Sequence, residues 1–185
     1  MRICKDSKDV MKRVEMDFLN ESRNCIFREN ASQIDVAGKK FGPFKKGVPV
    51  NLPNWVIENL LKHELVDIDT KDNYESFKRL RNLNDEEKKN PYKLQQFPPS
   101  LYTAIARKSL RLQSDKTSMD PITYEDVENL RKMTFFLVET RLSKILRVAN
   151  SNAYQDTRKL MAHEERWLCE ELVELLSGWR QNIMD

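Results

Sequence analysis

The sequence has few of the residues on which most disulfide, metal and catalytic sites depend. Its 185 residues include only four glycines, three cysteines and two histidines. Cys4, Cys25 and Cys169 lie far apart and form no C-x-x-C pair, which argues against a disulfide framework and against a zinc site. No apolar run approaches the roughly 20 residues of a membrane-spanning helix, and no signal-peptide core follows Met1. We therefore expect a protein without membrane segments in a reducing intracellular compartment.

The motifs of common enzyme classes are also missing. His63 lies near the end of a short predicted helix, where a capping or surface role is expected. His163 is followed by Glu164, but no second histidine completes an H-E-x-x-H zinc motif. Walker A, G-x-G-x-x-G and G-x-S-x-G patterns are absent, and the acidic clusters at residues 85–87 and 170–171 are expected to be solvated helix faces. The sequence thus predicts a protein that is not an enzyme, with no cofactor and no metal.

The sequence also lacks a large excess of either positive or negative charge. The chain has 32 basic and 29 acidic residues, so its formal net charge is only +3. Such a balance does not imply duplex binding driven by counterion release. One local excess surrounds a Gly/Pro-rich turn and consists of Lys39, Lys40, Lys45 and Lys46. A solvated loop is the simpler interpretation of these lysines, and a contact with DNA is the alternative.

Glycine and proline gather in one short stretch of the chain. Gly38, Gly42 and Gly47 fall within ten residues, and Pro43, Pro49 and Pro53 lie in the same neighbourhood. Because proline removes a backbone donor and glycine permits positive φ, this stretch should form turns and short edge strands. Runs of β-branched and aromatic residues predict strands near residues 24–29, 33–37, 48–50 and 65–68.

A short helix is predicted within this β-rich part. Pro53 suits the first turn of a helix, and the apolar face that follows carries Trp55, Val56, Leu60 and Leu61. Residues 1–70 are therefore predicted to form a small β-rich domain with one short helix. Residues 71–99 are predicted as a helical connector that ends in a proline-rich boundary at residues 90–99, because three prolines there cannot continue a helix.

The rest of the chain, residues 100–185, has a helical pattern throughout. Ser100 is a candidate N-cap, and Asp120 followed by Pro121 is a second helix start. The helix after Pro121 would span roughly 25 residues, or about 38 Å. A last helix is predicted from about Ala153 towards the C-terminus. The predicted fold class is α+β, with a small β-rich N-terminal domain followed by an all-α domain.

The long helix after Pro121 has two apolar stripes. One contains Leu137 and Ile145, and a second, rotated by about 100°, contains Phe135 and Leu146. A helix in a small free-standing bundle needs only one buried stripe, so the second is a candidate contact with another subunit. Two tryptophans of the last helix are further candidate interface anchors, Trp167 and Trp179.

The stretch at residues 41–60, FGPFKKGVPVNLPNWVIENL, resembles GINS complex subunits that carry a small β domain before their helical domain. The matching positions include Gly42, Pro43, Phe44, Gly47, Pro49, Pro53 and Trp55. Further likeness follows at residues 97–102 and in the stretch that contains Arg141, so the resemblance covers about residues 38–149. The order of the domains resembles the second-subunit type of eukaryotes and its archaeal counterpart.

This resemblance implies a non-catalytic scaffold in DNA replication. Its implied partners are other GINS subunits in a tetramer, the MCM helicase, a RecJ-like protein and the DNA polymerase or primase machinery. The implied place is the replication fork, in the nucleus of a eukaryote or the cytoplasm and nucleoid of an archaeon. The alternative function is a DNA-binding accessory module that uses the loop from Lys39 to Lys46.

Overall fold

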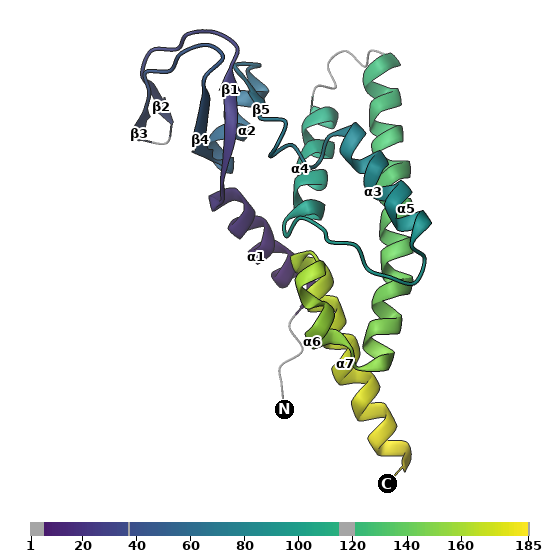
Figure 1. Ribbon diagram of the computed structural model, residues 1–185. Coiled ribbons are helices and arrows are strands. Elements are labelled where there is room, and N and C mark those ends of the chain that lie inside the picture. The colour runs from purple at the N-terminus through teal and green to yellow at the C-terminus, as the bar shows by residue number, and fades with distance from the viewer. Residues whose placement is uncertain (1–5, 37, 115–120, 185) are drawn as a thin grey trace. The chain divides into compact units, whose positions relative to one another are not determined.

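The computed structural model describes residues 6–36, 38–114 and 121–184 (Figure 1). The chain divides into two compact units, Met1–Tyr74 and Glu75–Asp185, and each is described by itself. The first contains small antiparallel sheets and the second is helical, which confirms the predicted α+β fold class.

A three-stranded antiparallel sheet forms the centre of the first unit. β1 (Ser22–Phe27) lies between β4 (Pro49–Pro53) and β5 (Val66–Ile68). Buried residues alternate along β1, so every second side chain faces the core. The prolines of β4 are accommodated because β4 lies at the edge of this sheet and, among the described strands, pairs with β1 alone. The strands predicted near these positions are confirmed, with ends shifted by a few residues.

A separate two-stranded hairpin extends the β-rich part. β2 (Ile34–Val36) was predicted, whereas its antiparallel partner β3 (Lys39–Phe41) was expected only as part of a turn-rich stretch. Two backbone hydrogen bonds between Ala31 and Phe44, at 3.0 and 2.8 Å, tie the chain after β3 to the segment before β2.

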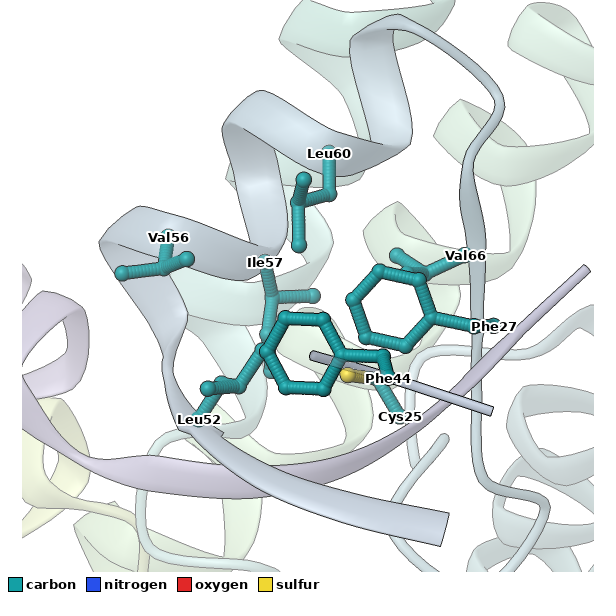
Figure 2. Packing of buried hydrophobic residues seen from close by; sticks show 8 residues of the cluster. All are labelled: Cys25, Phe27, Phe44, Leu52, Val56, Ile57, Leu60 and Val66. Carbon is teal, nitrogen blue, oxygen red and sulfur yellow. The ribbon is translucent and has the colours of Figure 1, made fainter. Parts of the chain in front are cut away.

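The core of the first unit lies between the sheet and α2 (Asn54–Lys62). Eight buried side chains form it: Cys25, Phe27, Phe44, Leu52, Val56, Ile57, Leu60 and Val66. The rings of Phe27 and Phe44 stack with centroids 4.2 Å apart. Figure 2 shows Ile57 and Leu60 pointing from α2 towards these rings. Offset stacking and the burial of several branched side chains account for the stability of so small a core.

A second helix in this unit corrects the prediction of one short helix. α1 (Ser7–Asn20) begins where the side chain of Asp6 accepts a hydrogen bond from the backbone N–H of Lys8. Val10, Val14 and Phe18 recur at four-residue spacing, and Phe18 is buried. This spacing places the three residues on one face of a helix. The pattern was missed because most of the residues between them are charged.

The second unit is a bundle built around one long helix. α5 (Pro121–Ser151) packs against α3 (Phe77–Lys89), α4 (Leu101–Ser114) and α7 (His163–Met184). α5 has 31 residues rather than the roughly 25 expected. The predicted start at Ser100 is confirmed for α4, while the predicted cap at Asp120 lies outside the described residues.

The two compact units divide at another place than the boundary predicted in the proline-rich stretch. The chain passes from the first unit to the second between Tyr74 and Glu75, so α3 and residues 90–99 belong to the helical unit. Proline does end α3, as expected, but the extended segment after it lies against α5 through side chain to backbone hydrogen bonds. Those contacts join elements far apart in sequence, so local composition did not reveal them.

The continuous last helix predicted from Ala153 is wrong. α5 ends at Ser151, and the next residue, Asn152, has a φ of 55°, a conformation that asparagine tolerates. A short helix, α6 (Tyr154–Thr157), and a 3-10 turn (Arg158–Leu160) follow before α7 begins. The carbonyl of Leu160 accepts from the N–H of Phe97 at 3.1 Å, and this tertiary bond holds the chain out of a helical path.

Candidate subunit interface

Arg141 is the centre of a buried polar network in the helical unit. The guanidinium is 1% exposed and donates to both carboxylate oxygens of Glu165, at 2.8 and 2.7 Å. It also donates to Glu87 at 3.1 Å and lies over the ring of Phe97 at 3.9 Å. Desolvation opposes the charged guanidinium, but the hydrogen bonds and charge of Glu165 and the charge of Glu87 outweigh it and raise the pKa of Arg141. Bidentate geometry of this kind is directional, so it fixes α5 against α7.

A second buried ion pair connects α3 with α5. Lys144 donates to a carboxylate oxygen of Glu87, and both side chains are almost completely buried. The hydroxyl of Tyr102, on α4, donates to Glu165 at 2.7 Å. Burial, followed by the nearby charge of Glu165, raises the pKa of Tyr102 well above its usual range. Three helices, α3, α5 and α7, thus contribute the charge-balanced cluster of Arg141, Lys144, Glu87 and Glu165, and α4 joins it through Tyr102.

Sequence reasoning placed Glu87 on a solvated helix face, and that prediction is wrong. Glu87 is 0% exposed. It continues the buried positions Leu80, Leu83 and Asn84 of α3, at helical spacing. That spacing was a usable signal, but carboxylates are rarely buried and need a partner that the local sequence does not contain. Glu165 was missed for the same reason.

The motif residues of the first unit lie where the chain turns and packs. Gly42 has a φ of +104°, and a Cβ there would lie 3.1 Å from the ring of Phe44, so only glycine fits without displacing that ring. Phe44 is a core residue and Gly47 has a φ of +76°. Pro43 follows Gly42 directly, and Pro49 and Pro53 bound β4.

Trp55 corrects another expectation. The sequence predicted Trp55 on the apolar face of the short helix, where a buried side chain is expected, but the indole is only half-buried. Its indole meets the ring of Phe41 edge-on, with centroids 6.2 Å apart. Val56, Ile57 and Leu60 make up the fully buried face of α2 instead. Trp55 packs against this core as a partly buried residue.

The second apolar stripe of α5 is exposed in this chain. Phe135 is 66% exposed and Leu146 is 45% exposed, whereas Leu137 and Ile145 are buried. Val138, at 39%, adds to the same exposed surface. Next to Phe135, a groove of about 500 Å³ runs between α4 and α5 and is lined by Ile105, Leu130 and other side chains. Exposed apolar side chains at helical spacing are typical of a surface that another protein covers.

The two tryptophans of α7 differ in their surroundings. Trp179 is 60% exposed and forms a stripe with Leu175 and Ile183, which are similarly exposed. Trp167 is half-buried, and its Nε1 is buried without a hydrogen-bond partner among the described residues. Trp179 therefore belongs to an exposed apolar surface, and Trp167 does not.

The four lysines of the basic loop, Lys39, Lys40, Lys45 and Lys46, are all exposed. Within residues 6–36, 38–114 and 121–184, none of them forms an ion pair with a carboxylate. The loop is held by the side chain of Asn30, which accepts from the N–H of Lys46 at 2.8 Å. Its charge is thus free to meet an external anion.

The described residues contain no group of three or more His, Cys, Asp or Glu side chains placed to hold a metal ion. His63 caps the end of α2 and is exposed, and His163 is the first residue of α7. None of the helices in the described ranges is both long and apolar enough to cross a membrane.

Comparison with known protein families identifies the family of the helical unit. The family model described as "Sld5: GINS complex protein helical bundle domain" matches residues 74–184, which is more than half of the chain. The matched range begins one residue before the second compact unit and contains the buried network and both exposed stripes. No curated protein matches the sequence. The chain belongs to the family of GINS complex proteins, whose helical bundle domain it carries in its C-terminal unit.

Proposed function

We propose that this chain is a non-catalytic scaffold subunit of a GINS complex, of the type that carries its β domain before its helical domain. Residues 1–70 would form the β domain and residues 100–185 the helical domain, with α3 and the extended segment joining the latter. The order of the two units and the motif around Gly42 and Trp55 support this subtype. Its place would be the replication fork, with other GINS subunits as direct neighbours.

The observation that carries the proposal is the pair of exposed apolar stripes on α5 and α7. Phe135 and Leu146 on α5, with Leu175 and Trp179 on α7, are each at least 45% exposed. Covering such side chains with a partner helix removes apolar area from water, at roughly 25 cal/mol per Å². The buried network behind the α5 stripe keeps this helix rigid, so little order is lost on binding.

The wider role that we propose is to link the MCM helicase with a RecJ-like partner, and to meet the polymerase or primase machinery. The buried polar network favours binding over catalysis. Its charged side chains, such as Arg141 with Glu165 and Lys144 with Glu87, are paired with one another rather than directed into a pocket. A subunit of this kind contributes surfaces and rigidity.

Leu146→Glu and Phe135→Glu test the assembly role. Each would bury an unpaired carboxylate in the subunit contact, so the yield of the co-expressed complex should fall about tenfold or more. Helix content by circular dichroism should stay that of the wild type, because both side chains are exposed within the subunit. Co-elution of MCM and the RecJ-like partner should be lost together with the complex.

Asn129→Glu is the matched control, since Asn129 is exposed on the same helix and its side chain points about 120° away from that of Phe135. It should leave the yield of the complex unchanged. Normal yield with both apolar-stripe variants would contradict the interface, and a well-behaved monomer that ignores cognate GINS subunits would contradict the assignment as a subunit.

A direct contact with DNA through the lysine loop is a second candidate, favoured by the four exposed cations without carboxylate partners. Binding of this kind would weaken steeply with added salt, by roughly one counterion for each phosphate contacted. Changing Lys45 and Lys46 to glutamate should then abolish binding of an oligonucleotide, and unchanged binding would remove this candidate.

A further inference from the structure

A ladder of basic residues on α5 holds the extended segment at residues 90–99, called here the strap. Arg141 donates to the carbonyl of Gln95 at 2.9 Å, Lys144 to that of Lys93 at 3.0 Å, and Arg147 to that of Pro91 at 3.2 Å. The donors are three residues apart on a helix face, and the acceptors are two residues apart on an extended chain. The strap is therefore fixed against the helix along half of its length.

The three donors of the ladder differ in how their charge is balanced. Arg141 and Lys144 are buried and paired with Glu165 and Glu87. Arg147 is exposed, and within the described residues it pairs with no carboxylate. Its guanidinium lies 5.0 Å from the ring centroid of Tyr92, which is 82% exposed. The last step of the ladder thus presents an exposed aromatic ring beside a charge that no carboxylate of the described residues balances.

More unpaired cations lie next to this ring in the chain. Lys88 and Lys89 end α3 four and three residues before Tyr92, and Lys93 follows it; all three are exposed. None of the three forms an ion pair in the part of the chain that the structure describes. The Nζ of Lys88 lies 4.5 Å from the ring centroid of Phe136. Two exposed acids of α3 reduce this local charge without cancelling it, Asp85 and Glu86.

We propose that the surface formed by Lys88, Lys89, Tyr92, Lys93 and Arg147, called here the strap surface, binds an acidic segment of a partner protein. Opposite charge supplies the attraction, and an exposed tyrosine beside an arginine is the composition typical of binding hot spots. The ladder orders the strap before binding, so a partner does not have to supply that ordering free energy.

The geometry favours a peptide over a nucleic acid. Sequence-tolerant binding of a single strand uses several ring faces, on which successive bases stack. Here Tyr92 has one face under Arg147, and Phe136 is only 36% exposed with Lys88 over its ring. One free ring face with four cations suits a short run of carboxylates that carries a single apolar or aromatic side chain.

The strap surface is distinct from the proposed subunit interface. Arg147 directly follows Leu146, so the two side chains point about 100° apart around α5. A variant of one surface can therefore leave the other unchanged. The inference goes beyond the scaffold role, and it can fail while that role stands.

Fluorescence anisotropy with the full-length chain tests the proposal. The probes are a labelled oligo-glutamate peptide with one central tyrosine and a labelled oligo-dT of matched charge, both at low and at moderate salt. The double variant Arg147→Glu and Lys88→Glu should weaken peptide binding about tenfold or more, since it reverses two of the four cations. Tyr92→Ala should weaken it about threefold or more.

Two controls keep the outcome decisive. Lys132→Glu changes an exposed charge on the same helix, about 22 Å from Arg147 along its axis, and should have little effect. Lys45→Glu with Lys46→Glu tests the other basic loop. Equal loss of peptide binding with Lys132→Glu or with the loop variant would overturn the proposal, as would unchanged binding by the strap variants. Tighter binding of oligo-dT than of the peptide at the strap surface would assign it to nucleic acid instead. A thermal unfolding curve like that of the wild type establishes that each variant is folded.

Discussion

The two compact units are held together by different chemistry. The core of the first unit is apolar, with Phe27 and Phe44 stacked between sheet and helix. The second unit also has apolar clusters, but its helices meet at Arg141, Lys144, Glu87 and Glu165, each no more than 4% exposed. An apolar core depends mainly on volume, whereas a buried ionic cluster depends on every partner being present. The comparison implies that the helical unit should be the less tolerant of conservative substitution.

Replacing Arg141 should have the largest effect. Arg141→Met leaves Glu165 and part of Glu87 buried without their cation, which should lower the free energy of unfolding by about 3–5 kcal/mol. Urea unfolding followed by circular dichroism measures this loss, and tryptophan fluorescence reports the same transition. Arg131→Met is the control, because Arg131 is 81% exposed and should change stability very little. A loss no greater than that of Arg131→Met would mean that the cluster does not hold the helices.

A conservative change in the apolar core should cost less. Phe27→Leu keeps the site apolar and removes part of the stacked ring, so we expect a loss of about 1–2 kcal/mol from a small cavity. Urea unfolding of the full chain is the measurement, with the exposed Val48→Ala as the control. A loss as large as that of Arg141→Met would erase the contrast between the two units.

The smallest effect should come from a surface ion pair of the first unit. Arg28 donates to both carboxylate oxygens of Asp67, at 2.9 and 2.7 Å, and the pair is exposed. The hydrogen bond from Arg28 lowers the pKa of Asp67 below its usual value. Because the folded pKa is lowered, the stabilisation is present above the unfolded value of about 4 and is lost as the pH falls through the folded value.

Arg28→Gln should therefore reduce stability slightly near neutral pH and not at all at a pH where Asp67 is protonated in the wild type. Added salt should shrink the difference, because exposed charges are screened. Thermal melts of the two proteins across the acid range are the measurement. A difference that grows as the pH falls would show that another group is responsible.

The candidate interface could be predicted from sequence for one helix and only in part for the other. Two apolar stripes on one helix require no tertiary information, and the exposure of Phe135 and Leu146 agrees with their pattern. The difference between Trp167 and Trp179 was not predictable, because the two share a helix and differ only in what packs on them. Their role in a subunit contact stays a prediction.

By itself, the sequence determined the features that depend on local backbone chemistry. Gly42 and Gly47 require turns, the prolines of β4 require an edge strand, and α4 begins after Ser100. Tertiary structure alone decided the burial of Glu87, the start of α7 and the place of the strap in the helical unit. Each of these depends on a partner far away in the chain: Lys144 for Glu87, Phe97 for the break before α7, and the basic ladder for the strap. A buried charge or an interrupted helix is unfavourable unless a partner elsewhere in the chain satisfies its polar groups. The local sequence does not contain that partner, so it predicts an exposed charge or a continuous helix instead.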